Sequence, residues 1–122
     1  MNERGFTIIE AIVAAAVLAT GLAALAQVIA VATIATARAR DMTRATLTAA
    51  QKLEELRANT FSGAAVDATD VVDQRFRRRW TVRALPAGAG IVIAVEVEPL
   101  ARTVPPVRLE TIRARPGTEA EP

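Results

Sequence analysis

The chain has 122 residues, 52% of them hydrophobic, and a formal net charge of +2, which is too small to imply a polyanionic partner by itself. Cysteine, histidine and tyrosine are absent, and Ser62 is the only serine. This composition excludes disulfides and thiolate metal sites, and it argues against hydrolytic or acid–base catalysis. We therefore expect no enzymatic activity, no cofactor and no metal site.

The first long element is an apolar run over residues 6–37, rich in Ala, Val, Ile and Leu, in which Glu10 is the only charged residue. As a helix, these 32 residues would rise about 48 Å, against about 30 Å for the hydrocarbon core of a bilayer. The run therefore predicts a membrane span.

Residues 38 to about 59 continue the helix in amphipathic form. Apolar side chains recur there every three or four residues, at Met42, Ala45, Ala49, Leu53 and Leu56. No proline or helix-ending glycine precedes Gly63, so we expect one continuous helix from about Phe6 to Asn59.

The pattern changes after Gly63. Residues 64–74 are polar, carry aspartates and show no clear period, which indicates a connection. Residues 75–85 and 91–98 alternate between apolar and charged side chains on either side of the turn sequence PAGAG, which predicts a β-hairpin. Residues 107–114 predict a third strand, and residues 116–122 a disordered tail.

The two charge patterns of the hairpin specify its register. The predicted opposite pairs are Ala84 with Ile91, Val82 with Ile93, Trp80 with Val95, Arg79 with Glu96, and Arg77 with Glu98. A shift by one residue would set apolar side chains against arginines. We expect an α+β fold in which the long N-terminal helix packs, through Met42, Leu53 and Leu56, on a small antiparallel sheet of about three strands.

The start of the chain carries a specific pattern. A polar leader, MNERG, ends at Gly5, and Phe6, Thr7 and Glu10 follow as GFTxxE before the long apolar run. In this arrangement the chain resembles the type IV prepilin-like family, which includes type IV pilins and the pseudopilins of type II secretion. The resemblance covers residues 1 to about 37.

The resemblance implies that a membrane prepilin peptidase cuts after Gly5 and that the new amino terminus, Phe6, becomes N-methylated. Glu10 would then pair with the Phe6 ammonium of a neighbouring subunit during filament assembly. An ionised carboxylate in a bilayer costs about 2.5–3.5 kcal/mol on insertion scales, and a cation from another subunit relieves that cost. Snorkelling of Glu10 towards the head groups is the alternative.

The expected domains are a leader peptide over residues 1–5, a transmembrane and assembly helix over 6–37, a small soluble pilin-like domain over 38–115, and the tail. The resemblance places the precursor in the bacterial inner membrane as a single-pass protein, with a cytoplasmic N-terminus before cleavage and a periplasmic C-terminal domain. The expected partners are other pilin or pseudopilin subunits, the prepilin peptidase and N-methyltransferase, the membrane and the inner-membrane assembly platform.

Two departures from major filament subunits favour a minor subunit: no proline precedes Pro86, and no cysteine is available for a C-terminal disulfide loop. The segment AQKLEELRA before a Trp-bearing strand is similar to small minor subunits of the I type in secretion or the V type in pili. We predict a minor subunit of a type II secretion pseudopilus that helps prime or cap the filament. The alternative is a minor pilin of a type IV pilus, acting in adhesion, motility or DNA uptake.

Two further interpretations concern topology and nucleic acid. A single-pass adaptor that never polymerises is one alternative. One arginine precedes the apolar run and three follow within residues 38–44, so the positive-inside rule favours a cytoplasmic C-terminus. The prepilin pattern requires the reverse orientation, and we follow it because it has several independent parts, whereas the charge rule has known exceptions. A DNA-binding strand is suggested by interleaved aromatic and basic residues, namely Phe76 and Trp80 with Arg75, Arg77, Arg78, Arg79 and Arg83. The alternation puts the aromatic rings on the face opposite most of these arginines, so core packing explains them better and nucleic acid is not expected as a partner.

A secretory signal peptide is the remaining alternative, because Ala35-Thr36-Ala37 forms an A-x-A site before Arg38. Signal-peptide cores run about 7–15 residues, which is half the length of this run. Mass spectrometry of the mature chain separates the two interpretations. We expect a methylated Phe6 at the amino terminus, whereas a start at Arg38 would contradict the prepilin interpretation.

Overall fold

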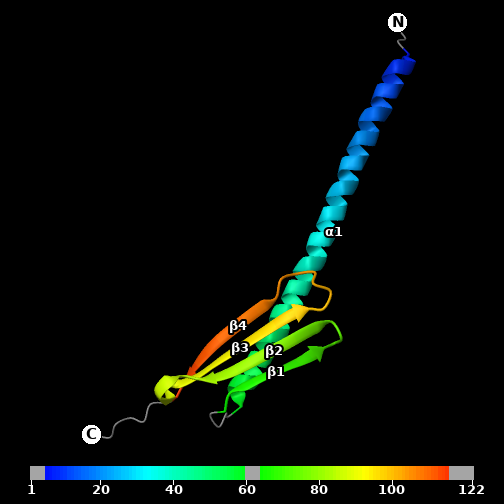
Figure 1. The fold of residues 1–122 in the computed structure, drawn as a ribbon. Coiled ribbons are helices and arrows are strands. Elements are labelled where there is room, and N and C mark those ends of the chain that lie inside the picture. Colours follow the sequence, from blue (N-terminus) through cyan, green and yellow to red (C-terminus); the bar gives the residue numbers. More distant parts are fainter. Residues whose placement is uncertain (1–4, 60–63, 116–122) are drawn as a thin grey trace. The chain divides into compact units, whose positions relative to one another are not determined.

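The computed structural model describes residues 5–59 and 64–115 (Figure 1). The elements are α1 (Ile8–Ala58), β1 (Val66–Val72), β2 (Phe76–Ala84), the short 3-10 helix η1 (Pro86–Gly88), β3 (Gly90–Pro99) and β4 (Val107–Ala114). They form two compact units, one ending at Ala37 and the other beginning at Arg38. The predicted α+β class is confirmed, with four strands in the sheet instead of about three. The predicted tail lies outside the described residues.

The prediction of one continuous helix is confirmed, since α1 runs unbroken over 51 residues. Within the apolar stretch, the hydroxyls of Thr20, Thr33 and Thr36 each donate to the carbonyl four residues earlier, at 2.8 Å. Hydroxyls that are paired within the helix do not need water, so these threonines are compatible with an apolar surrounding.

The described part of the first unit has no side chain buried by the rest of the chain. Its large apolar side chains are more than half exposed, from Phe6 at 91% to Ile34 at 53%. The most apolar 18-residue window of α1 has a mean hydropathy of 2.3. By length and composition, α1 can therefore cross a membrane.

The sheet is antiparallel with the order β1-β2-β3-β4 (Figure 1). The predicted hairpin register is confirmed at every pair, from Ala84 opposite Ile91 to Arg77 opposite Glu98. Residues 107–114 form the predicted strand, which pairs with β3.

The prediction of a connection over residues 64–74 is wrong, because residues 66–72 form strand β1 and pair with β2. Side chains of β1 alternate between half-buried and exposed, as in any edge strand with one covered face. Asp70 lies among the half-buried positions and Val71 among the exposed ones. A charged residue thus faces the core and an apolar residue faces solvent, which is the reverse of the usual pattern. The ion pair that allows Asp70 to face inward is described below.

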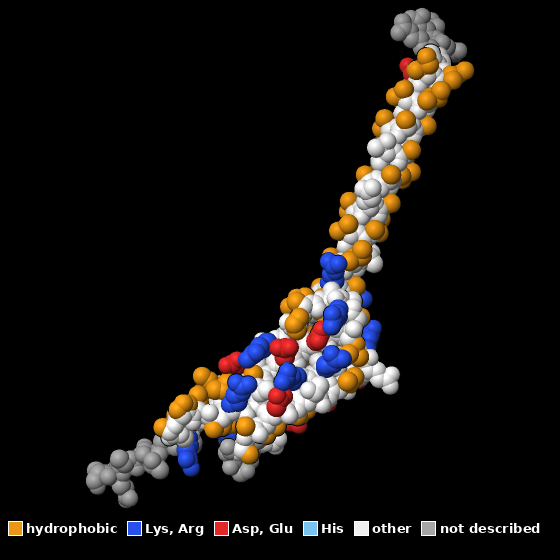
Figure 2. Space-filling model, viewed as in Figure 1, with side chains coloured by type: hydrophobic (Ala, Val, Ile, Leu, Met, Phe, Trp, Pro, Cys, Tyr) orange, Lys and Arg blue, Asp and Glu red, His pale blue; other side chains and the backbone are white. Residues whose placement is uncertain are grey.

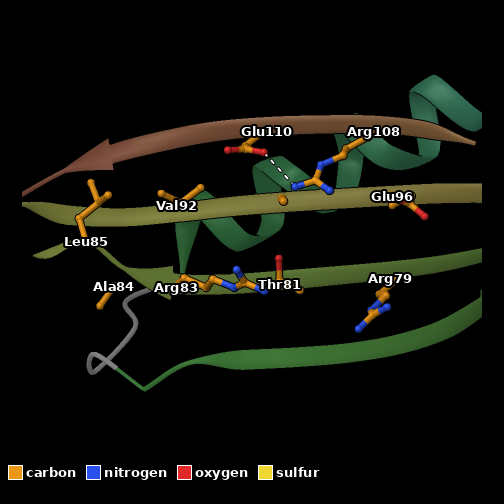
Figure 3. A pocket seen from close by; sticks show the side chains of 10 residues that line it. Arg79, Thr81, Arg83, Ala84, Leu85, Val92, Glu96, Arg108 and Glu110 are labelled. Atoms are coloured by element: carbon orange, nitrogen blue, oxygen red, sulfur yellow. Dashed lines mark hydrogen bonds and ion pairs between the residues drawn. The ribbon is translucent and has the colours of Figure 1, made fainter.

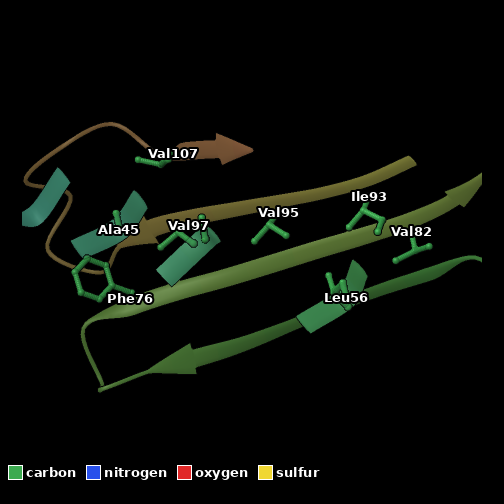
Figure 4. Packing of buried hydrophobic residues seen from close by; sticks show 9 residues of the cluster. Ala45, Leu56, Phe76, Val82, Ile93, Val95, Val97 and Val107 are labelled. Atoms are coloured by element: carbon green, nitrogen blue, oxygen red, sulfur yellow. The ribbon is translucent and has the colours of Figure 1, made fainter. Parts of the chain in front are cut away.

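The core of the second unit lies between the last turns of α1 and one face of the sheet (Figure 4). Small side chains of the helix, Ala45 and Ala49, are fully buried, which lets the backbone of α1 approach the sheet closely. They pack with Leu56 and with sheet residues of which the fully buried ones are Val82, Ile93, Val95 and Val97. The predicted packing of the helix on the apolar face of the sheet is thus confirmed.

The predicted helix stripe is only partly right. Met42 is 43% exposed and Leu53 half-buried, whereas Lys52 is buried at 8% exposure. The Lys52 ammonium lies 4.2 Å from the centroid of the Trp80 ring and 2.8 Å from a carboxylate oxygen of Glu55. A long aliphatic stem can pack like an apolar side chain when its charged end has such partners.

Candidate functional site

The predicted processing and assembly residues lie at the start of the first unit. Gly5, Phe6 and Thr7 precede the first residue of α1 and are exposed. A Cβ atom built on Gly5 would meet no other atom within 4 Å. The peptide bond between Gly5 and Phe6 therefore lies outside the helix. Arg4 lies outside the described residues.

Glu10 sits in the first turn of α1 and is held there by reciprocal hydrogen bonds with Thr7. The Thr7 backbone N–H donates to Glu10 Oε2 at 3.0 Å, and the Glu10 backbone N–H donates to Thr7 Oγ1 at 3.3 Å. This is a capping box, which satisfies two of the backbone donors left unpaired at a helix N-terminus. The Glu10 carboxylate is oriented by the cap and lies at the positive end of the helix dipole.

The capping role of Thr7 was missed by sequence reasoning, although its signal is present. The spacing T-x-x-E before an apolar run, Thr7 to Glu10, is the sequence signature of a capping box. The same residues that resemble a processing motif therefore also specify where the helix starts.

Residues 1–26 match the family model described as the prokaryotic N-terminal methylation motif. This chain carries the type IV prepilin-like signal. No curated protein and no solved structure gives a significant match to the chain. The prepilin-like signal contains Gly5, Phe6, Thr7 and Glu10, and it ends within α1, before the second unit begins.

Outside the prepilin-like signal, the arginines of β2 are the second candidate site. The bidentate pair formed by Arg78 with Asp70 includes an Nε–Oδ1 distance of 2.9 Å, and Arg77 lies 4.0 Å from Glu98. Arg78 also lies 5.7 Å from the centroid of the Trp80 ring.

The expected ion pair of Arg79 with Glu96 is wrong, although their register is right. Arg79 instead donates Nε and Nη2 to the two carboxylate oxygens of Asp67, at 3.1 and 2.8 Å. Asp67 belongs to β1, the strand that was not expected, and it offers Arg79 a bidentate partner. Sequence reasoning could not assign this pair without that strand.

Both aspartates of β1 are held ionised by these contacts. The hydrogen bond from Arg78 lowers the pKa of Asp70, against an opposing contribution from burial, and the hydrogen bond from Arg79 likewise lowers the pKa of Asp67. Three arginines of β2 therefore face carboxylates.

A shallow cavity of about 530 Å³ lies over the outer face of the sheet (Figure 3). Its lining mixes arginines with glutamates, and Arg108 and Glu110 form an ion pair of 3.1 Å within it. In the part of the chain that the structure describes, no group of three or more acidic side chains could hold a metal ion. The cavity offers no nucleophile with an adjacent base and no metal-ligand set among its lining residues.

The Asp70–Arg78 pair generates a prediction about stability. Replacing Asp70 with Asn leaves the Arg78 side chain, which is 12% exposed, without its carboxylate. Because the Asp70 side chain itself is 37% exposed and partly screened, we expect a loss of about 1 kcal/mol in the free energy of unfolding at neutral pH. Denaturant unfolding of the full chain in detergent, followed by the fluorescence of Trp80, the only tryptophan, measures this loss.

Asp67→Asn is the matched control, because Asp67 and Arg79 are both more than half exposed and their pair should contribute less. A lowered pKa in the folded state means that the contribution of Asp70 is complete above the unfolded-state pKa, about 3.9. It is lost as the pH falls through the folded-state pKa. In Asp70→Asn, the free energy of unfolding should therefore depend less on pH below about pH 4 than in the unmodified chain. If the two variants lose the same free energy of unfolding at neutral pH, the Asp70–Arg78 pair does not stabilise the fold more than the exposed Asp67–Arg79 pair.

Proposed function

We propose that this chain is a minor structural subunit of a type II secretion pseudopilus and that it assembles through its N-terminal helix to help prime or cap the filament. The observation that supports the proposal is the prepilin-like signal over residues 1–26, which lies at the start of an apolar run, residues 6–37, in which Glu10 is the only charged residue. A minor pilin of a type IV pilus is the alternative, and the genes that neighbour this one would separate the two.

In this proposal, residues 1–5 are the leader, residues 6–37 the membrane and assembly segment, and residues 38–115 the soluble domain, with the tail after it. The leader faces the cytoplasm, where a prepilin peptidase cuts after Gly5 and N-methylates Phe6. The soluble domain then lies on the periplasmic side and contacts other pilin-like subunits. The inner-membrane assembly platform moves the chain from the membrane into the filament.

The chemistry of the first turn supports a docking role for Glu10. Only one oxygen of its carboxylate, Oε2, accepts the Thr7 N–H. A carboxylate offers about four acceptor positions, so an ammonium group can approach while the cap stays formed. The cap fixes the side chain before docking, which reduces the conformational entropy that is lost when a partner binds.

The proposed partner of Glu10 does not exist in the precursor. Cleavage after Gly5 converts an uncharged amide at Phe6 into an ammonium group. A carboxylate in a bilayer is unfavourable by about 2.5–3.5 kcal/mol on insertion scales, and pairing with this cation from a neighbouring subunit removes that cost. Processing would thereby favour the assembled state over the lone membrane state.

Substitution of Glu10 tests this role, and the capping box supplies a variant that isolates charge. Gln can replace Glu in a capping box, so Glu10→Gln should keep the helix start and lose only the charge. We expect normal membrane insertion, near-normal cleavage, and co-assembly weakened by about 100-fold, which corresponds to about 2.5–3.5 kcal/mol. Membrane fractionation, the mass of the mature chain and co-purification with a partner subunit measure the three steps.

Two companion variants complete the test. Glu10→Ala, which loses both the charge and the cap, should weaken co-assembly at least as much as Glu10→Gln. Thr7→Ala is the control for the cap, because it removes the hydroxyl, at about 0.5–2 kcal/mol of helix stability, but keeps the charge. If Glu10→Gln co-assembles like the unmodified chain while Thr7→Ala fails, Glu10 acts as a cap and the charge-pairing proposal is wrong.

A further inference from the structure

Arginines gather at the end of the second unit where the helix leaves its apolar stretch (Figure 2). Three of them, Arg38, Arg40 and Arg44, lie on the helix within seven residues after Ala37. Two more, Arg75 and Arg102, lie in the β1–β2 turn and the β3–β4 loop. We call these five residues the basic collar.

Hydrogen bonds hold both loops beside this part of the helix. The Leu100 N–H donates to the Arg75 carbonyl at 2.8 Å, which joins the β3–β4 loop to the β1–β2 turn. The Thr103 hydroxyl donates to Asp41 Oδ2 at 2.8 Å, which joins the same loop to α1. Asp41, Arg75 and Leu100 also line one shallow groove. The collar is therefore a feature of the folded unit and not only of the sequence.

Most of the positive charge of the collar is not neutralised within the chain. Among the residues that the structure describes, no carboxylate lies within 4.0 Å of a guanidinium nitrogen of the four arginines Arg38, Arg40, Arg44 and Arg75. Arg102 lies 3.6 Å from Glu98, which also faces Arg77 at 4.0 Å. The other acidic residues at this end are Asp41, engaged by Thr103, and Asp73 in the β1–β2 turn. The five arginines of the collar thus outnumber the three carboxylates at this end, of which Glu98 is shared with Arg77.

The collar surrounds the helix instead of facing one side. At about 100° per residue, Arg38 lies on the same face as Ala45 and Ala49, which pack on the sheet. Arg40 and Arg44 lie on the other side of the helix. A protein partner that docks on one face would engage only part of this set. A charged layer that encloses the helix would engage all of it.

The spacing along the helix also fits a bilayer. The charge-free stretch, residues 11–37, rises about 40 Å, close to the 40–45 Å of a bilayer with its head groups. The three helical arginines then follow over about 9 Å. Exposed apolar side chains lie among them, with Met42 and Leu100 each 43% exposed. Arginines mixed with apolar side chains are typical of surfaces that contact anionic lipid.

We propose that the basic collar binds the anionic head groups of the membrane leaflet from which the second unit emerges. The lipid would hold the β1–β2 turn and the β3–β4 loop against the membrane until the chain is extracted into an assembly. This proposal rests on the membrane insertion proposed above, and its chemistry is separate from that of the prepilin-like signal.

Hydrogen–deuterium exchange of the full chain in nanodiscs tests the collar. One set of discs contains phosphatidylcholine alone, and the other contains phosphatidylcholine mixed with phosphatidylglycerol. We expect amides over residues 73–77 and 99–106 to exchange about fivefold more slowly in the anionic discs, the effect of one basic side chain at an anionic surface. Raised salt should remove the difference, because it screens these charges.

Arg75→Gln with Arg102→Gln should abolish the difference between the discs. Arg83→Gln is the matched control and should keep it, because Arg83 is an exposed arginine near the end of β2, away from the collar. Equal exchange in both discs would overturn the proposal, as would protection that needs an added pilin-like subunit, since a protein would then be the partner. Incorporation of the chain into the discs is measured separately. A chain that does not enter them would contradict the proposed membrane segment, and with it the proposal that the collar binds lipid.

Discussion

Glu10 is the one ionisable side chain in an apolar stretch of more than thirty residues, and its carboxylate limits the environments in which that stretch is stable. In water, the exposed apolar side chains of α1 are unfavourable. In lipid, the carboxylate is unfavourable. The proposed helical assembly, in which apolar side chains would cover one another and the amine of Phe6 would meet Glu10, would satisfy both requirements. The capping bonds with Thr7 orient this carboxylate at the start of the helix.

In the second unit, the same helix packs on a sheet. Beyond Ala37, α1 acquires a single buried stripe in which alanines give close contact with the sheet and Lys52 spans the surface of Trp80. Two ion pairs also join the edge strand β1 to β2. Asp70 pairs with Arg78 on the covered face of the sheet, and Asp67 pairs with Arg79 on the exposed face. A small sheet with few large core residues thus gains specificity from charged contacts as well as from apolar burial.

The sequence predicted correctly those elements in which the apolar face and the charged face require the same strand register. The hairpin of β2 and β3 was predicted to the residue because apolar and charged positions required the same register. Strand β1 was missed because Asp70 faces inward, where an apolar residue is expected, and its burial depends on the ion pair with Arg78. Lys52 was absent from the predicted helix stripe for a related reason, since its burial depends on contacts with Trp80 and Glu55. The capping role of Thr7 has a sequence signal, its spacing of three residues to Glu10.

The most direct test of the central claim is zero-length carbodiimide cross-linking of Glu10 in assemblies of the mature chain with its partner subunits. This reagent forms an amide only between a carboxylate and an amine that already touch. We expect peptides that contain Glu10 to be joined to the amino-terminal residue of a different subunit, and Glu10→Gln to remove these products. Intact assemblies in which Glu10 forms no link, or links only to Phe6 of its own chain, would contradict the account.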